Sequence, residues 1–238
     1  MTISFDVSYA VTSLMSETWN INKGVVVPET EDVVLKNGGK LVDATYLYAD
    51  LADSSGLAQL MLKETTAKII RAYINSAVRI CRHYNGAIRS VDGDRVMAIF
   101  IGGRKNNDAV RAALGISWAV SKVIAPAISE TWNDVDKSWT LNHGVGIDTG
   151  DALIVRGGVR DNNDLISVGR SPNVAAKLSE IRSSNQSIHI TQEVYAYLDE
   201  ENRLAGDGRT SMWTKRGFMS VGGSSVTVLG SSYYWSPA

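Results

Sequence analysis

Two stretches of sequence decide the expected fold: Ala44-Thr45-Tyr46-Leu47-Tyr48-Ala49-Asp50 and Ser90-Val91-Asp92-Gly93-Asp94-Arg95-Val96-Met97-Ala98-Ile99-Phe100. The first is an apolar run that ends in Asp50. In the second, an Asp-Gly pair between two runs of strand-forming residues is typical of a tight hairpin turn. If the strands are neighbours, the carboxylates of Asp50 and Asp94 meet at one edge of a sheet.

Beside these carboxylates the chain continues as a loop of small residues, Leu51-Ala52-Asp53-Ser54-Ser55-Gly56. Hard divalent cations prefer carboxylate oxygens, and a triphosphate binds exposed N–H groups together with such cations. Each motif alone favours an ordinary solvated aspartate. The two motifs together, in this order, favour a site for phosphoryl transfer.

The composition fits a globular enzyme. The chain has 238 residues, 44% of them hydrophobic, which is enough for one sizeable core. Its net charge is −1 and its cations form no dense run, which disfavours binding to nucleic acid or to an anionic membrane. The single Cys81 excludes an intramolecular disulfide and is expected to be a packed core thiol. No apolar stretch approaches the roughly 20 residues of a membrane span, so we expect a cytoplasmic protein.

Helical and strand patterns alternate along the chain. Residues 1–40 are expected to be a leader with a short helix at 7–19 and a loop, followed by one domain at 41–238. The expected helices are 57–83, 109–124 (stopped by Pro126), 173–181 and 193–198. The expected strands are 43–50, 87–91, 95–101, 140–148, 152–155, 165–168 and 188–191, with one or two more in the tail at 213–235. The hairpins predict a mixed or antiparallel sheet.

These motifs resemble the class III nucleotidyl cyclases. The family's first catalytic segment is a strand that ends in Asp before a small-residue loop, and its second is a Gly-Asp at a hairpin, here Gly93-Asp94. In the third, an Asp on a strand precedes by nine residues an Asn that opens a helix, and a cation follows four later; Asp164, Asn173 and Lys177 have these spacings. The resemblance covers about residues 40–198. It implies an α+β, ferredoxin-like catalytic domain that works as a head-to-tail homodimer with shared active sites.

One branch of that family is a closer match, the pyrimidine nucleotidyl cyclases of bacterial Pycsar anti-phage defence. The segments that resemble this branch are 41–55, 92–101 and 163–170. The branch implies synthesis of a 3′,5′-cyclic pyrimidine monophosphate that activates a separate effector protein.

The resemblance assigns roles to individual residues. Asp50 and Asp94, with the carbonyl of Leu51, would hold two divalent metal ions, Mn²⁺ or Mg²⁺, and Asn173 would orient the ribose. Lys177 would stabilise charge on the α-phosphate, although most family members have Arg there, which binds in a bidentate way that Lys cannot. The expected phosphate-binding loop consists of Ala52, Asp53, Ser54, Ser55 and Gly56.

The base is the least determined part of the expected substrate. A Lys four residues before the second metal ligand reads adenine in the adenylyl cyclases, and here that position is Ser90. Asp164 can accept an N–H from uracil or cytosine, and Arg89, Ser90 or Arg156 could donate to a carbonyl of uracil. These donors favour UTP over CTP. The alternatives are a cytidylate cyclase, an adenylate cyclase, or an inactive cyclase-like module that binds nucleotides or partners.

Overall fold

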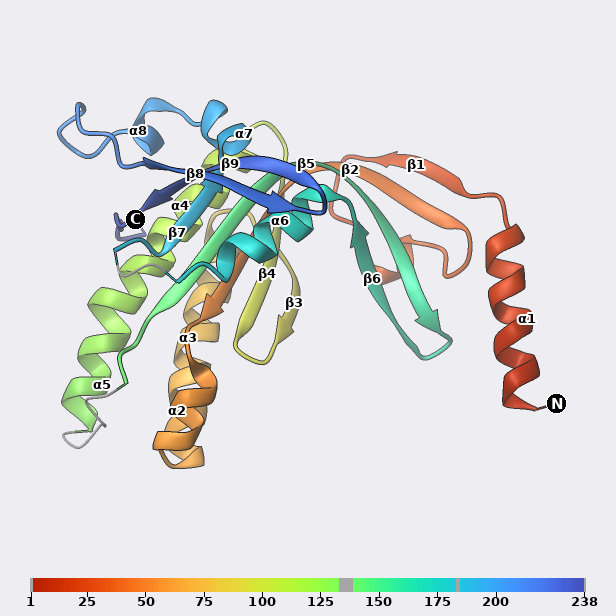
Figure 1. Cartoon of the computed structure of the whole chain (residues 1–238), viewed down its shortest axis with the longest axis horizontal. Helices are drawn as coiled ribbons and strands as arrows, with labels where there is room; N and C mark the ends of the chain where they lie inside the picture. The colour runs from red at the N-terminus through yellow and green to blue at the C-terminus, as the bar shows by residue number, and fades with distance from the viewer. Residues whose placement is uncertain (1, 133–138, 183–184, 238) are drawn as a thin grey trace.

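The computed structural model describes residues 2–132, 139–182 and 185–237. Their strands form one sheet, shown in Figure 1. The strand order is β3 (Ala87–Asp92), β4 (Arg95–Ile101), β2 (Gly38–Leu51), β5 (His143–Val159), β7 (Ile188–Thr191), β9 (Ser224–Ser231) and β8 (Thr214–Val221). In addition, β1 (Asn20–Gly24) pairs with β2, and β6 (Asn162–Val168) pairs with β5. The β1–β2 and β5–β7 pairs are parallel and the others antiparallel, so the expected mixed sheet is confirmed.

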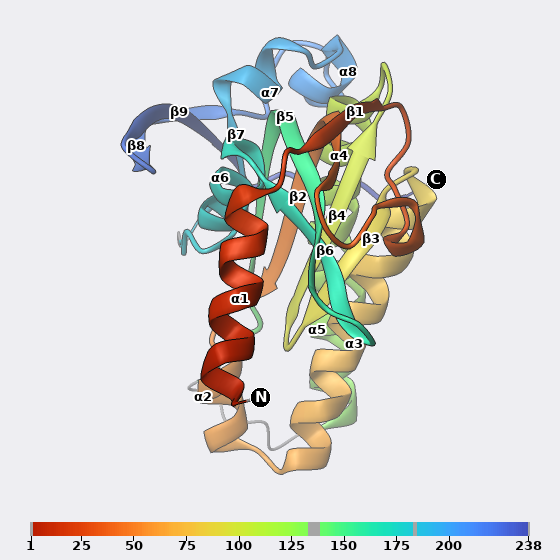
Figure 2. The same ribbon diagram turned by 90° about the vertical axis from the view of Figure 1, so that its right-hand side faces the viewer.

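Helices lie on both faces of this sheet. Two long ones, α3 (Lys63–His83) and α4 (Lys105–Trp118), pack on one face, and α6 (Arg170–Ser179) packs on the other. The remaining helices are α1 (Ile3–Ser16), α2 (Ser54–Leu60), α5 (Ala125–Thr131), α7 (Gln192–Ala196) and α8 (Glu200–Arg203), with a 3₁₀ turn η1 (Thr30–Asp32) and a π-helical segment η2 (Ala119–Ile124). Figure 2 shows α3, α4 and α5 behind the sheet and α1 in front of it.

The two faces of β2 explain this arrangement. Successive strand residues point to opposite faces. Leu47, Ala49 and Leu51 pack into the cluster that contains the buried side chains of α3 and α4. Ala44 and Tyr46 pack on the opposite face, with Ala175 of α6. Asp50 follows the same alternation as Tyr46 and therefore belongs to the α6 face, the face with less helical cover.

Five expected elements differ from the structure in their bounds. The helix at 57–83 is divided at Met61 and Leu62, which are extended, into α2 and α3. The helix at 109–124 begins at Lys105 and continues past Pro126 to Thr131, because the segment just before the proline is π-helical (η2), which changes the backbone hydrogen bonding at that point. The strands at 140–148 and 152–155 are one strand, β5. Within 1–40, the expected helix at 7–19 is α1, and β1 was not predicted.

One helical run tests the expectation about membrane spans. By length and composition alone, the 27-residue helical run Lys105–Thr131 is long and apolar enough to cross a membrane, so the expectation that no stretch approaches this length was wrong. More than half of its most apolar window is buried inside the molecule, as in the core helix of a globular protein. Cys81 of α3 is a buried core thiol, as expected, and burial raises its pKa to about 12.

Candidate active site

The segments that carry Asp50 and Asp94 are neighbours in the sheet. Residue Asp50 of β2 is opposite Arg95 of β4 in the antiparallel ladder, which puts Asp94 one step further along. There the N–H of Leu51 donates a hydrogen bond to the carbonyl oxygen of Asp94, with an N···O distance of 3.4 Å. The structure therefore brings the two aspartates together at one edge of the sheet.

Two arginines contact the carboxylate of Asp50, which is 7% exposed. The Nη2 of Arg182 lies 2.5 Å from Oδ2, and the Nε of Arg95 lies 3.4 Å from Oδ1. Arg95 also contacts Glu180 at 3.3 Å. Sequence analysis did not identify Arg95 or Arg182, because only the folded chain brings them to Asp50.

Close packing of α6 on β5 explains how Arg182 reaches the site. Gly144 is opposite Asp50 in the β2–β5 ladder. A Cβ atom on Gly144 would collide with the carbonyl of Ser179, so only glycine allows the end of α6 to approach this strand position. The segment that follows α6 then carries Arg182 over Asp50.

Main-chain groups of the loop after Asp50 are hydrogen-bonded to the segment that precedes β5. The N–H of Ala52 donates to the carbonyl of Asn142 at 2.9 Å, and the indole Nε1 of Trp139 donates to the carbonyl of Asp53 at 3.3 Å. Asp53 has a left-handed backbone, with φ of 54°, and its carboxylate accepts the N–H of Gly56 at 3.1 Å. The N–H groups of Ala52 and Gly56 are thus bonded within the chain, although both were expected to bind phosphate.

Asn173 and Lys177 lie on α6. The amide of Asn173 donates to the carbonyl of Gly169 at 3.0 Å, and the ammonium of Lys177 lies 3.1 Å from Glu180. Both side chains are on the surface, and neither contacts Asp50 of the same chain in the structure. Glu180 joins Lys177 to Arg95, which in turn contacts Asp50.

The four residues expected near the base divide into two groups. Arg89 lies 3.9 Å from Asp164 and 3.2 Å from Glu29, so the structure brings Arg89 and Asp164 together. Arg156 instead donates to Asn163 at 2.6 Å, within the β5–β6 hairpin. Ser90 is exposed on β3 and has Met97 opposite it in the ladder.

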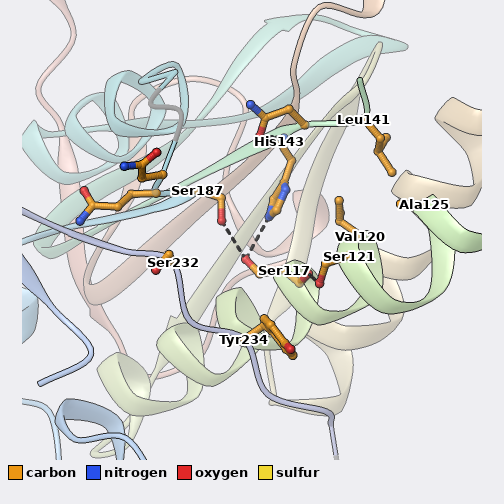
Figure 3. Close-up of a pocket in the computed structure, with 12 residues that line it drawn as sticks. Ser117, Val120, Ser121, Ala125, Leu141, His143, Ser187, Ser232 and Tyr234 are labelled. Carbon is orange, nitrogen blue, oxygen red and sulfur yellow. Dashed lines mark hydrogen bonds between the residues drawn. The ribbon is translucent and has the colours of Figure 1, made fainter. Parts of the chain in front are cut away.

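A pocket of about 450 Å³ lies next to the loop, on the α4 side of β5 (Figure 3). Ser117 Oγ lies 3.0 Å from His143 Nε2 and 3.2 Å from Ser187 Oγ, within hydrogen-bond distance of both. Burial, together with the charge of Arg182, lowers the pKa of His143 to about 4, so this ring is neutral at pH 7. The residues that line the pocket carry hydroxyl, amide or apolar side chains, apart from this neutral histidine. Because no cation is among the described residues that line it, the pocket does not suit a triphosphate.

The carboxylate oxygens at this edge of the sheet suit a hard divalent cation as ligands. The carboxylate of Asp50 is buried beside two guanidinium groups, which shows that this position accepts positive charge, and the half-buried Asp94 follows one step along. Within the described ranges, no three His, Cys, Asp or Glu side chains form a metal-binding group. The remaining ligands would therefore be main-chain, phosphate or water oxygens.

Solved structures with a similar fold include nucleotide cyclases. The adenylyl cyclase CyaB from P. aeruginosa superposes with a TM-score of 0.67 over 81% of this chain and 95% of that chain, at 19% sequence identity. The guanylyl cyclase Cya2 gives 0.65 over 84% of this chain and 96% of that chain, at 17% identity. The fold is therefore that of the class III nucleotidyl cyclase domain, as the sequence motifs predicted.

Sequence relatives give a narrower assignment, while no protein-family model matches the chain. A uridylate cyclase from Rhodovulum sp. is 37% identical over 238 residues, covering 100% of this chain and 99% of the relative. Another, from Xanthomonas perforans, is 36% identical over 218 residues, covering 91% of each. A more distant cytidylate cyclase from Staphylococcus aureus is 28% identical over 163 residues, covering 65% of this chain and 38% of that protein. This chain belongs to the uridylate cyclase family.

Proposed function

We propose that this protein converts UTP to 3′,5′-cyclic UMP and pyrophosphate, with two divalent metal ions, Mn²⁺ or Mg²⁺, at each active site. The observation that carries the proposal is the meeting of Asp50 and Asp94 at one sheet edge, in a chain whose relatives along nearly its whole length are named uridylate cyclases. An inactive module that only binds nucleotides would not need both carboxylates.

The reaction forms a bond between the ribose 3′-oxygen and the α-phosphorus and breaks the bond from that phosphorus to the pyrophosphate oxygen. Metal ions at Asp50, Asp94 and the Leu51 carbonyl would supply the charge that lowers the pKa of the 3′-hydroxyl and holds the triphosphate. Asn173 orients the ribose, and Lys177 stabilises the charge that develops on the α-phosphate. The N–H groups of residues 53–55 donate to the phosphates, while those of Ala52 and Gly56 keep the loop in shape.

Two neighbouring side chains are the basis for proposing uracil as the base. Arg89 lies 3.9 Å from Asp164 and also contacts Glu29 at 3.2 Å, so a donor and an acceptor lie side by side and a base would replace part of these contacts. Uracil presents an N3–H flanked by carbonyl oxygens, so it can donate to Asp164 and accept from Arg89. Ser90 offers a second, shorter donor. Arg156 is bonded to Asn163 and would have to leave that partner to reach a base.

The direction of α6 supports a homodimer with shared sites. Ser179 lies at Gly144, opposite Asp50, whereas a Cβ on Gly150 would meet Ser171 at the other end of the helix. Asn173 is six residues before Ser179, about 9 Å along the helix at about 1.5 Å per residue, and its exposed side chain does not contact its own Asp50. We propose that Asn173 and Lys177 complete the site that contains Asp50 and Asp94 of a second copy.

The product would act as a messenger. We propose that cyclic UMP is made in the cytoplasm during phage infection and activates a separate effector protein, as the resemblance to the Pycsar branch implies. The bulk charge of −1 gives no reason for a nucleic-acid partner.

Product identification tests the activity. The purified protein is incubated separately with UTP, CTP, ATP and GTP in the presence of Mn²⁺, and the products are identified by mass spectrometry. Cyclic UMP should dominate. Asp94→Asn should abolish it, whereas Asp92→Asn, which changes an exposed carboxylate on the same turn, should leave turnover nearly unchanged. A product dominated by cyclic AMP or cyclic GMP would overturn the pyrimidine assignment.

One alternative substrate has support of its own. The match to a cytidylate cyclase, and the ability of Asp164 to accept from the exocyclic amine of cytosine, favour CTP as second candidate. Cyclic CMP as the main product in the same experiment would refute uracil and leave the cyclase assignment in place.

A further inference from the structure

Arg89 is the extra residue of a β-bulge in the β3–β4 hairpin. Ile88 is opposite Ala98 and Ser90 is opposite Met97, so Arg89 has no counterpart on β4. A bulge re-aims the side chain of its extra residue, and bulges are frequent next to active sites. The side chain of Arg89 is only 13% exposed, although β3 is at the edge of the sheet. Because a covered charge needs partners, groups from other segments have to hold this guanidinium.

Two carboxylates flank the guanidinium of Arg89, and their contacts with it differ. Nη1 donates a hydrogen bond to Oε2 of Glu29 at 3.2 Å. Nη2 lies 3.9 Å from Oδ1 of Asp164, which is too far for a hydrogen bond, and that oxygen already accepts the N–H of Leu165 at 2.7 Å. Glu29 is therefore the partner that fixes Arg89, and the wider contact with Asp164 is the one that a base would replace.

Glu29 is itself fixed by the structure of its segment. It is the N-cap of the 3₁₀ turn η1, and its side chain accepts the N–H of Asp32 in a capping box. Asp32 in return accepts the N–H of Glu29 at 2.9 Å. Pro28 and Val33, on either side of this turn, are buried, and Figure 2 shows the segment beside β3. An exposed ion pair is weak when two mobile side chains must be ordered, but here the carboxylate is ordered before it meets Arg89.

The position of Glu29 determines what Arg89 can do. Without Glu29, the neighbouring acceptor for the guanidinium would be Asp164, and the two opposite charges would close into a direct, bidentate pair. Such a pair would consume both the donor and the acceptor that uracil needs for its carbonyl oxygen and its N3–H. A carboxylate on the other side of the guanidinium keeps Arg89 and Asp164 apart, so both stay available to a base.

We infer that Glu29 is a positioning residue for the base, which holds Arg89 so that uracil enters between Arg89 and Asp164. The inference rests on the proposed function and deepens it, because it names a further residue that determines how the base is bound. Glu29 does not touch the base and acts only through Arg89. The loop within residues 1–40 is then part of the substrate site.

A double-mutant cycle in steady-state kinetics tests this role on the full chain. Glu29→Gln keeps the size of the side chain and removes its charge, and should raise KM for UTP about 10-fold with little change in kcat, because only binding of the base is affected. Glu31→Gln makes the same change on an exposed carboxylate of the same turn and should leave KM unchanged. Arg89→Ala should raise KM by itself, and adding Glu29→Gln to it should raise KM no further.

Inorganic tripolyphosphate separates base binding from damage to the whole site, because it competes for the metal and phosphate positions and has no base. Its inhibition constant should be the same in Glu29→Gln as in the wild type. An inhibition constant that rises as much as KM would show that Glu29 supports the site as a whole, which would overturn the inference.

The remaining outcomes distinguish the inference from the proposed function. If the wild type makes cyclic UMP and Glu29→Gln has an unchanged KM for UTP, the role of Glu29 is refuted and the cyclase assignment stands. The same holds if Glu29→Gln raises KM equally with and without Arg89, because Glu29 then does not act through that residue. A wild type that makes no cyclic pyrimidine nucleotide would overturn both.

Discussion

Arg182 holds its Nη2 atom 2.5 Å from Oδ2 of Asp50, on the carboxylate that the proposed reaction requires for metal binding. Arg95 contacts the other oxygen of the same group, so protein cations are next to both oxygens. A metal ion that binds Asp50 has to displace at least part of this arrangement. We therefore expect the ion pair that Arg182 makes to lower the apparent affinity for metal.

Removing the guanidinium of Arg182 should strengthen metal binding. We expect Arg182→Gln to bind Mn²⁺ about 5-fold to 10-fold more tightly, since an ion pair of this exposure is worth about 1 kcal/mol. Isothermal titration calorimetry without nucleotide measures this directly. Arg160→Gln, which removes an exposed arginine from the β5–β6 turn, is the matched control and should leave the affinity unchanged. Equal or weaker binding by Arg182→Gln would mean that Arg182 supports the metal site instead of competing for it.

Two inactive variants should restore activity to each other. Mixing Asp50→Ala with Asn173→Ala should return about a quarter of the wild-type activity, because half the dimers are hybrids and each hybrid has one intact site. The assay is cyclic UMP formation after the subunits have exchanged. Asp50→Ala mixed with Asp94→Ala is the control, since both changes fall in the same half of the site and every hybrid site stays damaged. If proven subunit exchange gives no rescue in the first mixture, the site is not shared.

The parts of the fold that could be predicted are those with strong local signals. The Asp-Gly turn fixes the β3–β4 hairpin, and the apolar run before Asp50 fixes β2. The single strand β5 could not be recognised, because Thr149-Gly150-Asp151 looks like a turn although it stays in register with β2. Strand β1 is polar and exposed, and only its pairing with β2 makes it a strand.

The candidate site also has a part that could be predicted from the sequence and a part that could not. The adjacency of Asp50 and Asp94 could be predicted, because each follows a recognisable strand signal and the two strands are neighbours. Arg182 and Trp139 could not be predicted, since each reaches the site through packing of distant segments. Arg182 depends on the close approach of α6 to Gly144, which a sequence shows only as one more glycine.

Trp139 should act as a positioning residue for the loop after Asp50. Its indole N–H bonds to the carbonyl of Asp53, so Trp139→Phe removes one hydrogen bond and keeps the aromatic packing. We expect KM for UTP to rise about fivefold with a small change in kcat, since one hydrogen bond is worth about 1 kcal/mol. Trp213→Phe loses a comparable bond, from Nε1 to the carbonyl of Asn202 at 2.8 Å, away from the loop. That control should lower the Tm and leave KM unchanged; equal KM values in both variants would remove Trp139 from this role.

His189 should limit the stability of the fold in acid. It is completely buried on β7, and neither ring nitrogen has a hydrogen-bond partner among the described residues. Burial, reinforced by the charges of Arg216 and Arg182, lowers its pKa from 6.5 to about 4. Between these values the unfolded chain binds the proton and the folded chain does not, so the free energy of unfolding falls as the pH drops from 6.5 towards 4.

Replacing the ring with an apolar side chain of similar size should remove this effect. We expect His189→Leu to stabilise the fold by about 1–3 kcal/mol at pH 7, because two buried unpaired nitrogens disappear. The gain should grow by about 2 kcal/mol between pH 7 and pH 5, since each unit of pH below 6.5 contributes about 1.4 kcal/mol. Urea unfolding at the two pH values measures both quantities, with the exposed His83→Leu as control. The variant still contains His143, whose pKa is lowered to a similar value, so its free energy of unfolding still falls in acid, but less steeply than that of the wild type. A variant whose gain over the wild type is the same at pH 5 as at pH 7 would show that His189 takes up its proton without unfolding.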